Sequence, residues 1–198
     1  MATIRPFRGL RFSEAAGPLA DLVAPPYDVI SPDEREVLAS KNDHNVVELT
    51  LPQGEPDDRS KFIKYAKSAA LLAEWRRQGV MAVEEDPAFY RYTQWFTIPG
   101  STEIFVRRSV ISLIKTEPYE KGVVLPHEQT FPTHKEDRLR ILEATRAHLE
   151  CIFGLFEDEG GHLFNQIDHA TGNVVAAVTP DDGVRHLLET IDEPSTVE

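Results

Sequence analysis

The segment from residue 89 to residue 114 has the composition of a long β-hairpin. Residues 89–98 are rich in aromatic and β-branched side chains, and residues 104–114 return to the same composition, which favours strands. Pro99–Thr102 separates them with turn residues. Two strands joined so closely pair antiparallel. The sequence therefore predicts an α+β (mixed α/β) fold with a predominantly antiparallel sheet, rather than a doubly wound parallel sheet.

Helices are predicted to flank this hairpin near residues 32–40, 59–78 and 134–149. The first has a complete start signal, because Ser31 can cap it, Pro32 suits its first position and Glu34 completes a capping box. Gly79 follows the second helix where a terminating glycine belongs. Shorter strands are expected at residues 2–12, 46–51, 80–83, 150–157 and 173–178, a short helix at 162–169, and a strand or helix at 184–190.

Length and charge limit the organisation and the partners. A chain of 198 residues can bury one sizeable core, so we expect a single domain over residues 1–192 followed by a tail at 193–198. The net charge of -12 repels nucleic acid and anionic membranes in general. The chain has no apolar run long enough to cross a membrane and no secretory leader pattern.

A single cysteine, Cys151, excludes an internal disulfide framework and fits a reducing compartment. It lies in an apolar run, which predicts a buried structural thiol rather than a nucleophile. Together with the missing leader, this predicts a soluble cytoplasmic protein.

A polar loop between Pro126 and Pro132 precedes the third predicted helix. The two prolines stiffen the backbone around three side chains that carry catalytic or binding chemistry: His127, Glu128 and Thr130.

The start of that third helix is predicted to attract anions. Thr133 is the expected N-cap, with Glu136 completing a capping box. His134, Lys135 and Arg138 add positive charge where unpaired amides already favour a phosphate or carboxylate. The alternative is a well-capped surface helix with no ligand.

A second proline-stiffened segment begins at Pro25-Pro26 and presents Tyr27 and Asp28. If it meets the loop that carries His127 and Glu128, two carboxylates and an imidazole lie near a cationic helix start. Such a group can hold Mg²⁺ beside a phosphate or supply a general base. The alternative is that Asp28 and Glu128 cap turns, and the residues alone leave both interpretations open.

The usual sequence signatures of nucleotide, hydride and acyl chemistry are absent. The chain has no Gly-x-x-x-x-Gly-Lys, no Gly-x-Gly-x-x-Gly and no Gly-x-Ser-x-Gly. It also lacks the His-Glu-x-x-His spacing that puts two imidazoles on one helical face, so no metal site is assigned.

Five short motifs carry a family resemblance. They are Arg5-Pro-Phe-Arg8, Ala24-Pro-Pro-Tyr-Asp-Val-Ile-Ser31, Pro87-Ala-Phe-Tyr-Arg-Tyr-Thr-Gln94, Pro126-His-Glu-x-Thr130 with Lys135-Glu-Asp-Arg-Leu139, and Asp182-Gly-Val-Arg-His186. In this order they resemble the domain-of-unknown-function 1015 family of bacteria and archaea. Members are usually longer and carry a later Asp-Gly-His-His-Arg segment, which this sequence lacks. The resemblance therefore implies that the chain is the N-terminal part of such a protein or a shortened member of the family.

The later segment of the family is similar to a phosphate-contacting motif of the ParB and sulfiredoxin-like fold, which includes an archaeal free-serine kinase. This resemblance implies a nucleotide-dependent phosphotransferase acting on a small hydroxylated metabolite such as serine, with a nucleotide and Mg²⁺ as cofactors. Its expected catalytic residues are Asp28, His127 and Glu128. Its expected substrate-binding residues are Tyr27, Thr130, Lys135 and Arg138.

The alternative function is a non-catalytic nucleotide- or metabolite-binding module that regulates a partner. In either case the expected ligand is a small metabolite or nucleotide. An unpaired edge strand can also drive formation of a homodimer.

Overall fold

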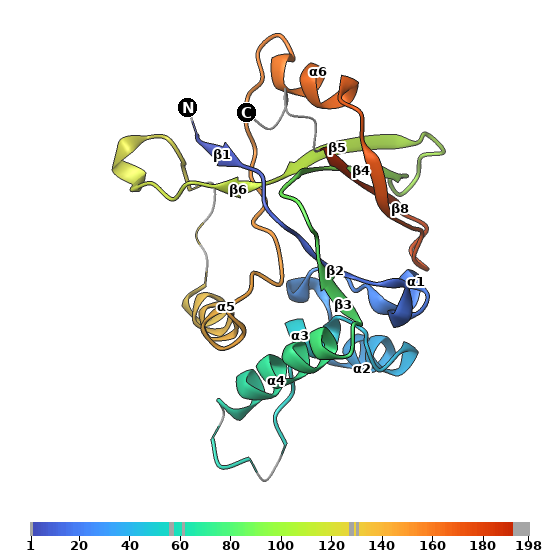
Figure 1. Cartoon of the computed structure of the whole chain (residues 1–198), viewed down its shortest axis with the longest axis vertical. Coiled ribbons are helices and arrows are strands. Elements are labelled where there is room, and N and C mark those ends of the chain that lie inside the picture. Colours follow the sequence, from blue (N-terminus) through green and yellow to red (C-terminus); the bar gives the residue numbers. More distant parts are fainter. Residues whose placement is uncertain (1, 56–57, 61, 127–128, 130, 192–198) are drawn as a thin grey trace. The chain divides into compact units, whose positions relative to one another are not determined.

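The computed structural model describes residues 2–55, 58–60, 62–126, 129 and 131–191. The chain forms two compact units (Figure 1). The sheet unit comprises residues 1–10, 83–127 and 153–198, and the helical unit comprises residues 11–82 and 128–152. That residues 1–192 act as one domain stays a prediction. Within the described residues, no helix has both the length and the apolar character needed to cross a membrane.

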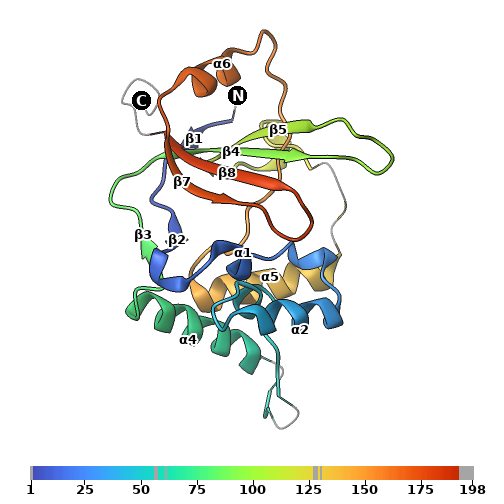
Figure 2. The same ribbon diagram turned by 90° about the vertical axis from the view of Figure 1, so that its right-hand side faces the viewer.

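A four-stranded antiparallel sheet forms the centre of the sheet unit (Figure 2). Its strands are β4 (Phe89–Phe96), β5 (Phe105–Ile111), β7 (Asn173–Val178) and β8 (Arg185–Ile191), in the order β5-β4-β8-β7. β4 and β5 are the predicted hairpin, with Trp95 opposite Val106. The antiparallel α+β class is therefore confirmed.

Shorter strands complete the pairing. The end of the predicted 104–114 strand continues as β6 (Leu113–Ile114), which pairs with β1 (Ile4–Arg5). β2 (Leu10–Phe12) pairs with β3 (Met81–Val83) where the boundaries of the two units fall. The predicted strand at residues 2–12 is thus two short strands separated by residues 6–9, which begin with Pro6. Proline lacks the amide hydrogen that a ladder requires.

Helix α6 (His162–His169) is the short helix predicted at these residues, and it packs against the sheet. Its buried Ile167 joins Phe89 and Ile191 in a core cluster. Arg91 of β4 also connects the sheet to α6. Its guanidinium binds both carboxylate oxygens of Glu189 at 2.8 Å and donates to the Ile167 carbonyl at 2.7 Å. The last carbonyls of a helix have no partner within the helix, so Arg91 satisfies groups at the end of α6.

The sheet also contains a short hydrogen bond of 2.6 Å between the Tyr92 hydroxyl and Nδ1 of His186. The two rings stack with an interplanar angle of 15°. Burial lowers the pKa of His186 from 6.5, against the opposing charge of Asp182. The folded protein therefore favours the neutral imidazole.

We expect this histidine to make the fold less stable in mild acid. As the pH falls through about 6.5, the unfolded chain takes up a proton that the folded chain resists, so the free energy of unfolding decreases. Urea unfolding of the native protein and of His186→Gln across this range measures the effect. The native protein should lose more stability on acidification than the variant, and equal losses would contradict the assignment.

The helical unit contains α1 (Leu19–Leu22), α2 (Pro32–Lys41), α3 (Val47–Thr50), α4 (Ile63–Arg77) and α5 (Pro132–Thr145). Short 3₁₀ turns occur at Glu14–Ala16 and Tyr27–Val29 here, and at Tyr119–Lys121 in the sheet unit. α4 and α5 pack against each other (Figure 2). The buried side chains of the unit include Leu22, Val47, Leu49, Leu72 and Trp75.

The helix signals predicted for α2 and α4 are present. The Ser31 hydroxyl accepts the Glu34 amide hydrogen, and the Glu34 carboxylate accepts the Ser31 amide hydrogen at 2.8 Å, which is the predicted capping box. Gly79 follows Gln78, the C-cap of α4, and has a φ of 74°, a conformation that glycine adopts without steric cost.

The predicted strand at residues 46–51 is wrong, because this segment forms α3. Asn45 decides the conformation: its side-chain oxygen accepts the Val47 amide hydrogen at 3.0 Å, while its amide group donates to the Asp21 carbonyl at 2.8 Å. Ser68 of α4 then donates to the Leu49 carbonyl at 2.9 Å. A short apolar run does not distinguish a strand from a buried helical turn, and these tertiary contacts favour the turn.

The predicted buried strand at residues 150–157 is also wrong. The segment has no regular structure, and its apolar side chains are exposed, with Ile152 at 88% and Leu155 at 79%. Cys151 is likewise exposed rather than buried. Partial desolvation by neighbouring atoms, and then the charge of Glu150, nevertheless raise the pKa of its thiol, so the thiol is not activated as a nucleophile.

Candidate functional site

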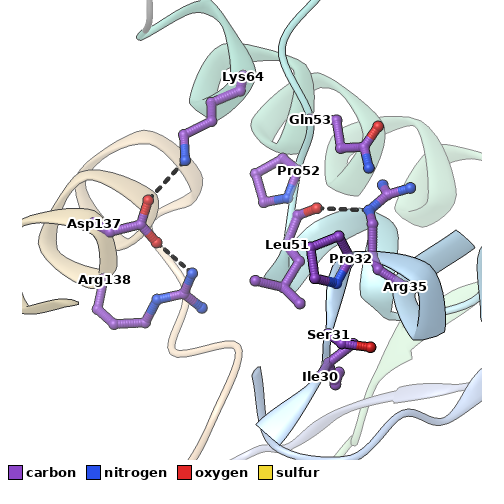
Figure 3. A pocket seen from close by; sticks show the side chains of 10 residues that line it. All are labelled: Ile30, Ser31, Pro32, Arg35, Leu51, Pro52, Gln53, Lys64, Asp137 and Arg138. Atoms are coloured by element: carbon purple, nitrogen blue, oxygen red, sulfur yellow. Dashed lines mark hydrogen bonds and ion pairs between the residues drawn. The ribbon is translucent and has the colours of Figure 1, made fainter. Parts of the chain in front are cut away.

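A hollow of about 240 Å³ lies within the helical unit (Figure 3). Its walls come from the start of α2, the segment after α3, α4 and α5. The lining residues are Ile30, Ser31, Pro32, Arg35, Leu51, Pro52, Gln53, Lys64, Asp137 and Arg138. Figure 3 shows Lys64, Asp137 and Arg138 on one side and Arg35 with Gln53 on the other.

Arg35 is a buried cation on the α2 side of the hollow. Its Nε donates to the Leu51 carbonyl at 3.0 Å, and its terminal nitrogen contacts the Glu48 carboxylate at 2.7 Å. A buried charge needs such partners. These contacts hold the guanidinium in one orientation beside the hollow.

Asp137 connects the cations on the opposite side. Its carboxylate accepts hydrogen bonds from Lys64 Nζ and the Tyr65 hydroxyl, both at 2.8 Å, and from Arg138. Burial alone would raise the pKa of Asp137, but the donors outweigh it and hold the pKa at about 2. Asp137 is therefore ionised at any physiological pH and fixes the positions of Lys64 and Arg138.

Arg138 joins α5 to the Pro25-Pro26 segment. Its guanidinium lies over the Tyr27 ring, 4.0 Å from the centroid, and a terminal nitrogen donates to Glu150 at 2.9 Å. The other oxygen of Glu150 accepts the Tyr27 amide hydrogen at 3.0 Å. The Pro25-Pro26 segment therefore lies against α5 at Arg138. That it also meets the loop of His127 and Glu128 stays a prediction, because those two residues lie outside the described part of the chain.

Burial raises the pKa of Tyr27, against the opposing effect of Arg138. Its hydroxyl is therefore protonated at neutral pH. The charge of Asp28, an exposed residue, acts on the same tyrosine. The His134 ring lies 6.1 Å from the Tyr27 ring, centroid to centroid.

The predicted cap of the third helix is wrong. α5 begins at Pro132 with Phe131 as its N-cap, and Glu136 binds Arg140 at 3.1 Å instead of closing a capping box with Thr133. Proline is favoured at the first helical position, so the helix starts before Thr133. It also ends at Thr145, earlier than the predicted residue 149.

The other predicted site residues are only partly located. Lys135 is exposed in the first turn of α5. His127, Glu128 and Thr130 lie outside the described residues. In the part of the chain that the structure describes, no group of three or more histidine, cysteine, aspartate or glutamate side chains is arranged to hold a metal.

Sequence reasoning missed Arg35, Lys64 and Asp137 as members of a site. Lys64 lies 73 positions from the Asp137 that it binds, so no local pattern relates the two. Asp137 stood within Lys135-Glu-Asp-Arg-Leu139, but nothing there separated it from the adjacent Glu136. One signal was available, because Asp137 directly precedes Arg138, which was predicted to bind substrate.

Comparison with known proteins gives one family. The family model described as "Protein of unknown function (DUF1015)" matches residues 4–198. Neither the curated proteins nor the solved structures gave a match. Since the family model matches nearly the whole sequence, the chain belongs to the DUF1015 family.

Proposed function

We propose that this chain is the N-terminal part of a nucleotide-dependent phosphotransferase, similar to a serine kinase, that acts on a small hydroxylated metabolite. The observation that carries the proposal is the convergence of Arg35, Lys64 and Arg138 on one hollow. Arginine and lysine are the side chains that proteins use to bind phosphate. In this proposal the hollow binds the phosphate that the enzyme transfers.

The charges and the rigidity of the lining support this role. The hollow is lined by three cations and by one carboxylate, Asp137. Each cation is held by an ion pair to Asp137 or to a glutamate of the helical unit. Cations held in position before a phosphate arrives lose little side-chain entropy when they bind it.

The remaining roles are assigned from the sequence motifs, and three of the residues concerned, His127, Glu128 and Thr130, lie outside the described residues. Asp28 or Glu128 is the proposed base, taking the hydroxyl proton as the metabolite oxygen bonds to the γ-phosphorus of ATP and ADP leaves. His127, Lys135 and Arg138 hold phosphate, while Tyr27 and Thr130 contact the substrate. Mg²⁺ is usually held by one or two carboxylates together with substrate phosphates, which Asp28 and Glu128 fit by type.

One observation favours a second candidate, a non-catalytic nucleotide- or metabolite-binding module. The carboxylate lining the hollow, Asp137, has a pKa of about 2, and a carboxylate so stabilised is a poor general base near neutral pH. The hollow itself is therefore better suited to binding than to proton transfer. Formation of ADP from ATP in the presence of serine distinguishes the enzyme from the binding module.

Thermal melting with Mg²⁺ and with inorganic phosphate, ADP, ATP or CTP tests the proposed anion site. A ligand at a hundred times its Kd stabilises the fold by about 2.7 kcal/mol, which raises the midpoint by about 5–10 °C for a chain of this size. At least one of these anions should produce this shift.

Two lysines of α4 provide a matched pair of variants. Lys64 lines the hollow, whereas Lys67 pairs with Asp58 and Glu55 elsewhere on the unit. Lys64→Met should remove most of the shift, measured from its own ligand-free midpoint, and Lys67→Met should retain it. If Lys64→Met retains the shift, the anion binds elsewhere. If none of the anions raises the melting midpoint of the native protein, the proposal is contradicted.

A further inference from the structure

The size and lining of the hollow restrict the ligand that it accepts. We infer that the hollow is a subsite for a small phosphorylated metabolite with a short carbon chain, and that the nucleotide binds outside it. This inference rests on the phosphate site proposed above and specifies its occupant.

Volume is the first argument. The hollow measures about 240 Å³, below the range of about 300–1,000 Å³ that is usual for pockets holding drug-sized ligands. A nucleoside triphosphate consists of a base, a sugar and three phosphates, and it needs a site in that larger range. A phosphate with a few carbon atoms fits the available space.

The lining lacks a surface suited to a nucleobase. None of the ten lining residues, all of which lie in the described part of the chain, is aromatic. Proteins that hold bases commonly stack them on aromatic rings. The nearby aromatic ring of Tyr27 already lies against the Arg138 guanidinium. The hollow therefore lacks the feature that would favour a nucleotide over a smaller phosphate.

The cations of the lining favour an anionic ligand. Arg35, Lys64 and Arg138 line the hollow with one carboxylate, Asp137, while Arg35 and Arg138 also pair with Glu48 and Glu150, which do not line it. A guanidinium has five N–H donors and an ammonium has three, so the paired cations keep donors for the oxygens of a phosphate monoester, which carries about −1.5 to −2 charges near pH 7. The lining's neutral polar residues are engaged elsewhere, because Ser31 caps α2 and the Gln53 amide donates to Glu36 at 2.6 Å. Recognition thus depends on the cations.

The apolar residues of the lining favour a ligand that carries a short carbon chain. The hollow is also lined by Ile30, Pro32, Leu51 and Pro52. These side chains offer no hydrogen bonds, but they can cover a few methylene groups, each worth about 0.8 kcal/mol when buried. A ligand with a phosphate and a short carbon chain contacts both kinds of surface, whereas inorganic phosphate contacts only the cations.

Calorimetric titration with propyl phosphate, inorganic phosphate, AMP and ATP tests the inference. Propyl phosphate should bind more tightly than inorganic phosphate, and saturating AMP or ATP should leave its Kd within about twofold. Lys64→Met should weaken propyl phosphate binding at least about tenfold, equivalent to about 1.4 kcal/mol, and Lys67→Met should have little effect.

A second pair of variants removes none of the cations of the hollow. Gln53→Glu adds a negative charge to the lining and should weaken propyl phosphate binding at least about fivefold, about 1 kcal/mol. Gln78→Glu is the control, because Gln78 also donates its amide to a glutamate, Glu74, but does not line the hollow.

The outcomes separate the two proposals. Competition by AMP or ATP that is lost in Lys64→Met would overturn the inference and leave the phosphate site in place. If propyl phosphate binds no more tightly than inorganic phosphate, the carbon-chain assignment is wrong. If neither Lys64→Met nor Gln53→Glu affects the binding of any anion, the proposed phosphate site itself is wrong.

Discussion

Replacing Arg91 with methionine is expected to lower the free energy of unfolding by about 3–5 kcal/mol. Arg91 and Glu189 form a two-pronged ion pair whose side chains are only 15% and 13% exposed. The same guanidinium binds carbonyl oxygens at the end of α6. Removing it leaves a nearly buried carboxylate and unsatisfied carbonyls, and both are costly away from water.

Arg108 provides the matched control for this measurement. It also connects the sheet to α6, through Asp168 at 3.0 Å, but its side chain is 56% exposed. Arg108→Met should therefore cost less than about 1 kcal/mol. Urea unfolding at about pH 7 compares the two variants. Equal losses would show that the burial of Arg91 does not determine its contribution.

A double variant separates the ion pair from the burial of an unpaired charge. Arg91→Met combined with Glu189→Leu removes both charges and retains apolar bulk. Replacing a buried pair by hydrophobic residues is often close to neutral, so the double variant should recover much of the stability lost by Arg91→Met. Failure to recover would assign most of the effect to the carbonyl contacts of α6.

Replacing Asp137 with asparagine is expected to cost about 2 kcal/mol at neutral pH. The pKa of Asp137 is lowered from 3.8 to about 2, and each unit corresponds to about 1.36 kcal/mol. Asparagine retains the shape but cannot compensate the charges of Lys64 and Arg138. Glu143→Gln is the control on the same helix, because Glu143 pairs with Arg140 at the surface.

The same carboxylate gives a defined pH dependence. Because its pKa is depressed in the folded state, its contribution is complete above about pH 4 and is lost as the pH falls towards 2. The free energies of unfolding of the native protein and Asp137→Asn should therefore differ at about pH 7 and converge in strong acid. A constant difference across this range would show that the ionised carboxylate is not the stabilising group.

Local signals in the sequence were sufficient for much of the fold. The aromatic and β-branched runs around Pro99–Thr102 predicted the β4–β5 hairpin, and the Ser31, Pro32 and Glu34 pattern predicted the start of α2. The short helix at residues 162–169 was also correct. In each case the residues that determine the structure lie within a few positions of one another, so composition and spacing carry the information.

Local signals failed where two local structures have similar energies. Residues 46–51 can form a strand or a helical turn, and contacts from Asn45 and Ser68 favour the turn. At α5, Pro132 and Thr133 both suit a helix start, and the proline occupies the first position. The apolar run after Glu150 resembles a buried strand, but the structure pairs it with no other strand among the described residues.

The sequence by itself determined the antiparallel α+β class, the bounds of α2 and α6 to within one residue, and the likeness to the DUF1015 family. It also predicted Tyr27 and Arg138 as residues of one site, and the structure places the Arg138 guanidinium over the Tyr27 ring. Only the tertiary structure brought Lys64 and Asp137 together across 73 positions and placed Arg35 on the opposite side of the same hollow. Capping and strand propensities act between neighbours in the chain, whereas ion pairs of this kind depend on how α2, α4 and α5 pack.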